Sequence, residues 1–373
     1  MYKKVILFIM IMSALSTPVL ALSAKSAILI DAHSGRVIKE ENARERMGMA
    51  STTKIMTAFV AVTQGDLDSI VTVSSNAAGV EGSSMYLRAG DKIKLRDLVY
   101  GLMLNSGNDA ATAIAEHIAG DTEGFAVMMN KQAAELGLRD TSFTNPHGLD
   151  DENHYTTAYD LAQIARRAME EPEFAEICGT VTKTITFSGI DGTVSRTLSN
   201  HNKLLRSYKG AAGIKTGFTK KCGRCLVSAA TRDSLTIIAV TLNASDDWSD
   251  HAELLDYGYT NLRYQKAFNK NDYMKSVNIL GAEEVRLALV AEESVSMAVA
   301  AEDAVRVVYD VPNYIKAPVY KNQAVGSVRV YLSGELIKTV RLMAEKEVRP
   351  NAANRIKNSF GYLITELLEM TAG

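Results

Sequence analysis

Two kinds of hydrophobic pattern meet in this 373-residue chain at residues 266–272, a polar stretch without periodicity. Before it, apolar runs of strand length alternate with longer helical patterns. After it, strand-length runs follow one another, and residues 326–332 alternate strictly, with Val328, Val330 and Leu332 on one face. Single cores stop growing near ~250–300 residues. We therefore expect an α/β domain followed by a small all-β domain.

The α/β region begins and ends with strand patterns. A turn-rich stretch, residues 31–35, separates two short apolar runs and predicts a hairpin. Strands are expected at residues 27–30, 36–38, 181–187, 226–230 and 235–242, and helices after Ser51 and at 95–104, 109–119 and 250–262. This order predicts a sheet whose first and last strands meet, with a helical insertion between them.

Both ends of the chain differ from the domains. Lys3 and Lys4 precede an apolar run and small residues, which is typical of a cleaved secretory signal. We therefore expect export to the extracytoplasmic face of the cell membrane or the cell wall. The end of the chain predicts an amphipathic helix, either lying on the outer surface of the cytoplasmic membrane or packed on its own domain. The predicted boundaries are 1–23 for the signal, 24–263 for the α/β domain, 264–275 for a linker, 276–348 for the all-β domain and 349–373 for the tail.

Charge and metal-ligand spacing exclude several classes. The net charge of -2 argues against nucleic-acid binding. His147, His154 and His201 lack the converging partners of a metal site, so structural roles, no metal and no cofactor are expected. Cys222 and Cys225 have redox-motif spacing without the usual surroundings; a structural role is favoured, and whether they form a disulfide stays open.

Ser51-Thr-Thr-Lys54 is the first chemical motif, because its spacing places a hydroxyl and an amine on one helical face. A serine needs a base to become a nucleophile, and a lysine serves only when burial or nearby positive charge lowers its pKa. The apolar helix that follows supplies the burial. The helix N-terminus adds N–H groups suited to an oxyanion. By itself the motif is common, and an exposed N-cap serine is the simpler interpretation.

Two further motifs, Ser106-Gly-Asn108 and Lys215-Thr-Gly217, follow in the order of the active-site set of penicillin-binding proteins and class A β-lactamases. Residues 49–57, 105–111, 145–149, 154–160 and 213–219 extend the match. The chain resembles the low-molecular-mass penicillin-binding proteins, the D-alanyl-D-alanine carboxypeptidase family of serine peptidases. The resemblance implies a β-lactamase/transpeptidase-like antiparallel sheet with flanking helices, followed by an all-β C-terminal domain.

The resemblance also implies roles and partners. Ser51 would be acylated, with Lys54 as base and Ser106 relaying a proton to the leaving D-alanine. Asn108 would hold the substrate amide and Lys54. At the third motif, Lys215 would add positive charge, Thr216 would bind the terminal carboxylate, and Gly217 and Phe218 would also bind the substrate, with the N–H groups of Ser51 and Phe218 as the oxyanion hole. The implied partners are peptidoglycan stem peptides and β-lactam antibiotics.

The sequence departs from the family pattern at residues 243–251, where many relatives carry an arginine and this chain has none, and at Cys222, where a smaller residue is usual. Because Cys222 is expected close to the site, a bond between Cys222 and Cys225 that gates the site is one hypothesis. The alternatives are a D,D-endopeptidase of the same chemistry, a β-lactamase, and a catalytically weak protein that binds the wall or β-lactams. No convincing second base for a lactamase is found between Asn145 and Val181.

Overall fold

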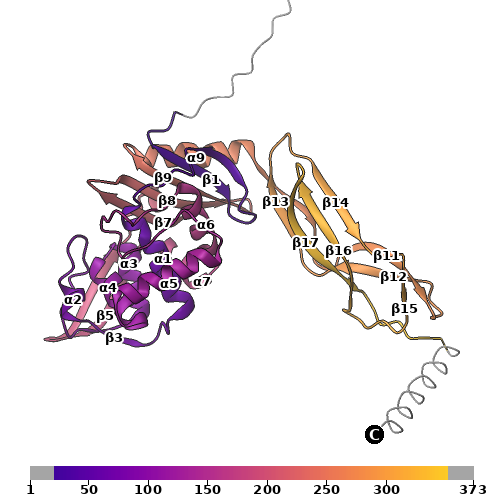
Figure 1. Cartoon of the computed structure of the whole chain (residues 1–373), viewed down its shortest axis with the longest axis horizontal. Coiled ribbons are helices and arrows are strands. Elements are labelled where there is room, and N and C mark those ends of the chain that lie inside the picture. Colours follow the sequence, from indigo (N-terminus) through magenta and orange to yellow (C-terminus); the bar gives the residue numbers. More distant parts are fainter. Residues whose placement is uncertain (1–20, 352–373) are drawn as a thin grey trace, which may run out of the picture.

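The structure is a computed structural model that describes residues 21–351. Most of the predicted signal peptide (1–23) and most of the predicted tail (349–373) lie outside the described residues. Figure 1 shows two bodies, an N-terminal domain from β1 to α9 and a β domain from β10 to β17. Within residues 21–351, no helix has the length and apolar content needed to cross a membrane.

A five-stranded antiparallel sheet organises the N-terminal domain, in the order β2-β1-β9-β8-β7. The expectation that the first and last strands meet is confirmed, since β1 pairs with β9 and Ile28 lies opposite Val240. Strand β7 is an edge strand and carries the third motif. The strands are β1 (Ser26–Asp31), β2 (Val37–Glu41), β7 (Ala211–Thr219), β8 (Gly223–Arg232) and β9 (Leu235–Ala244).

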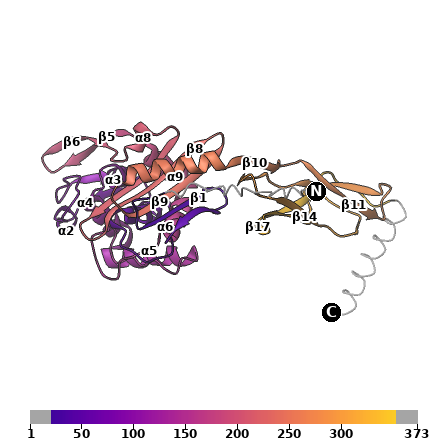
Figure 2. The same ribbon diagram turned by 90° about the horizontal axis from the view of Figure 1, so that it is seen from above.

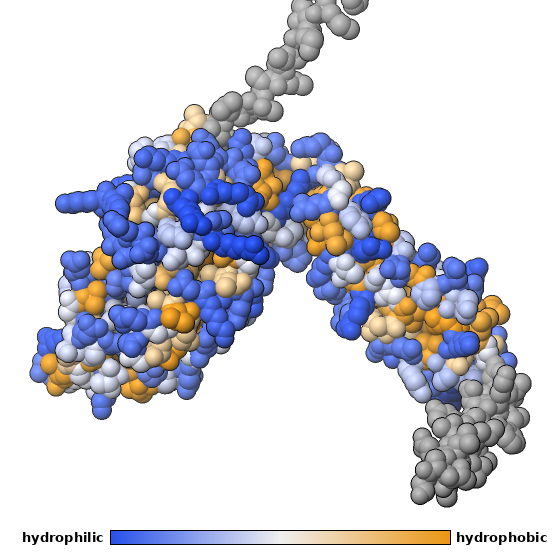
Figure 3. Space-filling model, in the orientation of Figure 1, coloured by the Kyte–Doolittle hydropathy of each residue, from blue (hydrophilic) through white to orange (hydrophobic). Residues whose placement is uncertain are grey.

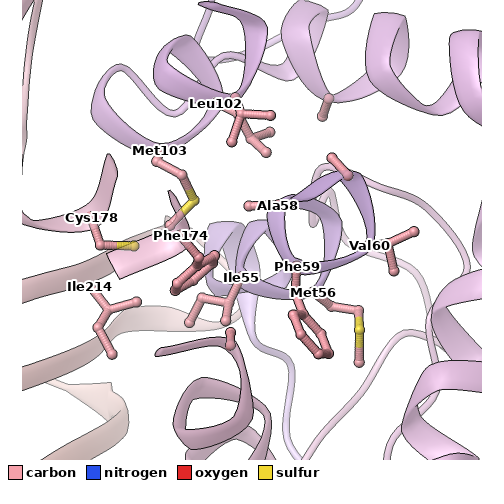
Figure 4. Packing of buried hydrophobic residues seen from close by; sticks show 14 of the residues in the cluster. Ile55, Met56, Ala58, Phe59, Val60, Leu102, Met103, Phe174, Cys178 and Ile214 are labelled. Carbon is pink, nitrogen blue, oxygen red and sulfur yellow. The ribbon is translucent and has the colours of Figure 1, made fainter. Parts of the chain in front are cut away.

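Helices cover one face of this sheet, and α9 covers the other. Helix α1 is almost entirely buried at its start, and Figure 4 shows Ile55, Met56 and Phe59 packed among side chains of several other elements. This apolar surround explains how the first motif is buried. The inserted elements are η1 (Ala50–Thr53), α1 (Lys54–Gln64), α2 (Ser75–Ala78), α3 (Leu95–Leu104), α4 (Asn108–Ala119), α5 (Thr122–Glu135), α6 (Ala158–Met169), α7 (Pro172–Gly179) and α8 (Leu204–Ser207).

Helix α9 (Asp247–Asn261) is tied to the sheet by a buried histidine. The ring nitrogens of His251 lie 2.5 Å from the hydroxyl of Ser228 on β8 and 3.0 Å from that of Thr241 on β9. These contacts fix which residues of β8 face α9. A second sheet, ordered β3-β4-β5-β6, flanks the helices; its strands are Ile70–Thr72, Lys92–Lys94, Thr182–Gly189 and Gly192–Ser199.

The β domain contains a two-stranded sheet, β10-β13, and a six-stranded sheet ordered β14-β16-β17-β12-β11-β15. The predicted alternation is confirmed, since Val328, Val330 and Leu332 of β16 are buried. The structure differs from the predicted linker at 264–275, which holds most of β10 and the start of β11. The strands are β10 (Arg263–Phe268), β11 (Tyr273–Leu280), β12 (Arg286–Ala291), β13 (Val295–Val299), β14 (Val305–Asp310), β15 (Tyr314–Lys316), β16 (Ala324–Leu332) and β17 (Glu335–Ala344).

The two domains meet at the β1–β2 turn. Both terminal nitrogens of Arg36 donate to the carboxylate of Asp303, one of them at 2.9 Å. Ala298 of β13 also joins the apolar cluster that contains Leu254 and Leu255 of α9. Seen from above in Figure 2, the β domain extends away from the N-terminal domain beyond this contact.

Candidate active site

The hydroxyl of Ser51 and the amine of Lys54 meet at the junction of η1 and α1. Lys54 Nζ donates to Asn108 Oδ1 at 2.7 Å and to the backbone oxygen of His147 at 2.5 Å, and it lies 2.9 Å from Ser51 Oγ, whose hydroxyl can donate to the neutral amine. The Lys54 side chain is fully buried. The spacing of three residues therefore produces the shared face that the sequence predicts.

The surroundings of Lys54 favour its neutral form. Burial lowers the pKa of Lys54 well below its usual value, and the positive charge of Lys215 lowers it further, whereas Asp109 opposes both effects. Asp109 itself accepts hydrogen bonds from the backbone N–H groups of Met85 and Leu87. A neutral amine one hydrogen bond from a serine hydroxyl can accept its proton.

The second motif lies in the turn between α3 and α4. The side chain of Asn108 bridges two elements, since Oδ1 accepts from Lys54 and Nδ2 donates to the backbone oxygen of Glu81 at 2.6 Å. Ser106 is nearly buried and adopts a φ of 60°, a left-handed conformation that is unfavourable for serine. The turn thus places Ser106 two positions before Asn108, the residue that accepts from Lys54.

The third motif approaches the first through a glycine. A Cβ on Gly217 would lie 3.1 Å from the backbone nitrogens of both Ser51 and Thr52. Since such a contact is tighter than a side chain normally allows, glycine lets β7 pack closely against η1. Lys215, on the same face by strand alternation, is buried and donates to the backbone oxygen of Thr216 at 3.0 Å.

Lys215 is the second buried lysine of the site. Burial lowers its pKa to about 7, and the interaction with Cys178 raises it slightly. Thr216 and Phe218 point to the opposite face of β7 from Lys215 and Gly217. Phe218 is 65% exposed at the edge of the sheet. The structure therefore joins Ser51, Lys54 and Asn108 by hydrogen bonds. The charge of Lys215 acts on Lys54, and Gly217 packs against the backbone of Ser51.

A buried histidine braces the turn that carries Ser51. The backbone N–H of Thr144 donates to Nδ1 of His154, so its Nε2–H donates to the hydroxyl of Thr53 at 2.8 Å. That hydroxyl donates to the backbone oxygen of Ala50. Burial lowers the pKa of His154 to about 4, which keeps the ring neutral. This contact agrees with the structural role expected of His154.

Sequence reasoning missed the part played by the loop at residues 145–149. The backbone oxygen of His147 accepts from Lys54, and that of Pro146 accepts from the hydroxyl of Thr57 at 2.6 Å. Gly148 has a φ of +88°, and a Cβ there would lie 1.9 Å from the backbone oxygen of Ala50. A hydrogen bond to a main-chain carbonyl does not depend on residue type, so the sequence does not predict it. The one signal in the sequence is that residues 145–149 match the family pattern.

A cavity of about 420 Å³ lies beside η1, lined in part by Ala50, Gly148, Asp150 and Cys222. Cys222 donates from Sγ to Asp150 Oδ1 at 3.1 Å. Cys222, Cys225 and Cys178 all carry free thiols in the structure. All three thiols are buried, and that of Cys222 also pairs with Asp150 at the wall of the cavity.

The segment at residues 243–251 contains the start of α9. Asp247 is buried, and its Oδ1 lies 3.6 Å from a terminal nitrogen of Arg224 on β8. An acidic residue of α9 thus faces an arginine of the neighbouring strand.

Comparisons with known proteins match both domains. The family model described as D-alanyl-D-alanine carboxypeptidase matches residues 12–246, and the model described as penicillin-binding protein 5, C-terminal domain, matches residues 263–350. The chain is 32% identical over 345 residues to the D-alanyl-D-alanine carboxypeptidase DacF of Bacillus subtilis, covering 89% of this chain and 88% of that protein. It is 31% identical to DacC of Escherichia coli, covering 88% and 85%.

Solved structures extend the similarity. Penicillin-binding protein 5 of Haemophilus influenzae superposes with a TM-score of 0.72 at 28% identity, covering 88% of this chain and 98% of that one. The DD-transpeptidase of Streptomyces K15 gives a TM-score of 0.61 at 34% identity, covering 64% of this chain and 98% of that one. The first neighbour spans both domains. The second covers a smaller share of this chain.

Proposed function

This chain belongs to the D-alanyl-D-alanine carboxypeptidase family, and we propose that it removes the terminal D-alanine of peptidoglycan stem peptides through an acyl-enzyme on Ser51. It is a serine hydrolase of the penicillin-binding protein fold. The observation that carries the proposal is the 2.9 Å hydrogen bond between the buried amine of Lys54 and the hydroxyl of Ser51.

Acylation begins with proton transfer from Ser51 to neutral Lys54. Ser51 Oγ attacks the carbonyl carbon of the penultimate D-alanine, and the carbonyl oxygen becomes an oxyanion held by the N–H groups of Ser51 and Phe218. Ser106 relays a proton to the nitrogen of the terminal residue. The peptide bond then breaks, D-alanine leaves, and an ester on Ser51 remains. Water hydrolyses this ester and restores the serine.

The remaining residues bind and orient the substrate. Asn108 keeps Lys54 in place, a role supported by its bridge between Lys54 and Glu81, and it also holds the substrate amide. Lys215 contributes positive charge at the cleft, and Thr216 binds the terminal carboxylate. Gly217 and Phe218 form the end of the edge strand along which the peptide lies. β-Lactams acylate the same serine because their strained amide occupies the position of the scissile bond.

We also propose that the protein is exported and acts at the extracytoplasmic face of the membrane or in the wall, with residues 349–373 at the membrane surface. Removing residues 352–373 should then release the protein from the membrane fraction. The predicted signal peptide, residues 1–23, would leave an exported protein that begins at Ala24. The intact mass of the exported protein tests this boundary.

Intact-mass spectrometry tests the proposed reaction directly. The purified protein is incubated with benzylpenicillin and separately with a peptide ending in D-Ala-D-Ala. We expect a stable adduct on Ser51 and release of D-alanine, and Ser51→Ala should abolish both. Release of D-alanine by Ser51→Ala would overturn the assigned nucleophile. An adduct without D-alanine release would favour the catalytically weak binding protein.

The endopeptidase alternative uses the same nucleophile on cross-linked peptides. Comparing a pentapeptide monomer with a cross-linked dimer separates the two. We expect the monomer to be the better substrate, and a clear preference for the dimer would replace the carboxypeptidase by the endopeptidase.

A further inference from the structure

An arginine lies beside the third motif, on the strand next to it. In the pairing of β7 with β8, Thr216 lies opposite Leu226 and Phe218 lies opposite Arg224. Cross-strand partners share a face, so Thr216 and Arg224 are diagonal neighbours, ~7–8 Å apart at the backbone and within the reach of a long side chain. The side chain of Arg224 is 52% exposed, which leaves its guanidinium accessible from solvent.

The carboxylate of Asp247 holds this arginine at the face of the sheet covered by α9. Its Oδ1 lies 3.6 Å from Arg224, which is an ion pair but longer than a hydrogen bond. The Asp247 side chain is 4% exposed, and within residues 21–351 this Oδ1 has no hydrogen-bond partner. Burial raises the pKa of Asp247, and the charge of Arg224 opposes that rise. The pair orients the guanidinium without occupying all of its N–H groups.

We propose that Arg224 binds the α-carboxylate of the substrate's C-terminal residue together with Thr216, and that Asp247 is the positioning residue for Arg224. This inference rests on the proposed function. A guanidinium grips a carboxylate through two parallel N–H···O contacts, which fixes orientation as well as affinity. Anchored at this end, the peptide presents its last amide bond to Ser51.

The inference explains the departure at residues 243–251. Relatives are expected to supply an arginine from that segment. Here the segment supplies an acidic partner, Asp247, and the neighbouring strand supplies the cation. Lys215 is a poorer candidate for binding both oxygens of the carboxylate. Its amine is a single point of charge, is buried, and already donates to the backbone oxygen of Thr216.

Two thioesters with the same acyl group test the assignment. Both carry an acetylated peptide ending in D-alanine; one has thioglycolate as the leaving group, and the other has the carboxamide of thioglycolate. Arg224→Met should lower kcat/KM for the thioglycolate ester about 10- to 100-fold and leave the carboxamide ester unchanged. Arg224→Lys should give an intermediate loss. Lys220→Met, an exposed lysine in the adjoining turn, is the control of equal charge change and should affect neither ester.

Three results would overturn the role of Arg224: equal losses on both esters, no loss on either, or the same selective loss in Lys220→Met. Thermal unfolding of each variant establishes that it is folded before the rates are compared. If the unmodified protein cleaves neither ester, the proposed function fails instead. The two failures are therefore distinguishable.

Discussion

The interior around α1 and the interior of the β domain bury different kinds of residue. Within residues 21–351, the buried polar and charged side chains belong to the N-terminal domain with the exceptions of Ser296 and of Asp303, which pairs with Arg36, and they include Lys54 and Lys215. The core of the β domain is built from aliphatic side chains, Met297 and Phe268. Figure 3 shows orange hydrophobic residues also on the visible surface of the β domain, while blue covers much of the N-terminal domain.

This difference indicates that the N-terminal domain buries groups that destabilise its fold but that the reaction needs. Burying an amine without a counter-charge costs free energy unless the amine becomes neutral. Helix α1 and strand β7 each carry such a lysine, and neither is needed to form a helix or a strand. The β domain contains no comparable group among its described residues. We therefore expect substitutions in the first interior to change activity and those in the second to change stability.

The largest effect on activity is expected from Lys54→Met. It keeps an apolar chain of similar length but removes the base, so acylation by benzylpenicillin should slow by about 10²- to 10⁴-fold. Stopped-flow or quenched mass spectrometry gives the rate. Lys94→Met, which alters an exposed lysine paired with Asp68, is the control. Acylation of Lys54→Met at the unmodified rate would remove the assigned role of this lysine.

A smaller effect is expected from Gly217→Ala. The added Cβ lies 3.1 Å from the nitrogens of Ser51 and Thr52, so β7 and η1 must separate by a few tenths of an ångström. Because catalysis depends on such geometry, acylation should slow by about 10-fold. Gly179→Ala, whose Cβ would lie 3.8 Å from the backbone oxygen of Ala212, an ordinary contact, should acylate normally. Equal rates for both variants would show that the close packing is not needed.

Lys215→Met should alter how stability depends on pH. Folding lowers the pKa of Lys215 from 10.5 to about 7, so between these values the unfolded chain binds more protons. The unfavourable contribution of Lys215 is therefore full below pH 7 and fades as pH rises towards 10.5. The stability advantage of Lys215→Met over the unmodified protein should shrink by about 1.4 kcal/mol per pH unit in this window. Urea unfolding at several pH values measures it, and a constant difference would contradict the shift.

The smallest effect on activity is expected from a substitution that creates a cavity in the core of the β domain. Leu342 of β17 is fully buried, and Leu342→Ala should destabilise the β domain by about 2–5 kcal/mol. Acylation by benzylpenicillin should stay unchanged at temperatures where the N-terminal domain is folded. Calorimetry and the acylation rate are measured on the same sample. Loss of acylation without unfolding would mean that the β domain supports the site directly.

Residues whose local pattern agreed with their final environment were predictable. The strand runs at both ends of the N-terminal domain predicted that β1 would meet β9, and the spacing of Ser51 and Lys54 predicted their contact. The alternation of β16 gave both its strand and its buried face. In each case the repeat of a single strand or helix determines which side chains face the interior.

Features created by tertiary contacts were not predictable. Strand β7 contains Gly213, Gly217 and a buried lysine, a composition that disfavours a strand, and pairing with β8 stabilises it. The polar stretch expected to be a linker forms β10 because β13 supplies its partner. The hydrogen bond from Lys54 to the backbone carbonyl of His147 was not predictable, because any residue type offers such a carbonyl.

The pH dependence of acylation measures the central claim most directly. If burial and the charge of Lys215 make Lys54 neutral in the folded protein, the rate constant for acylation of Ser51 by benzylpenicillin should rise with pH and level off well below 10.5, the ordinary pKa of lysine. A rate that keeps rising up to that pH would show that Lys54 stays protonated, and would contradict its role as the base.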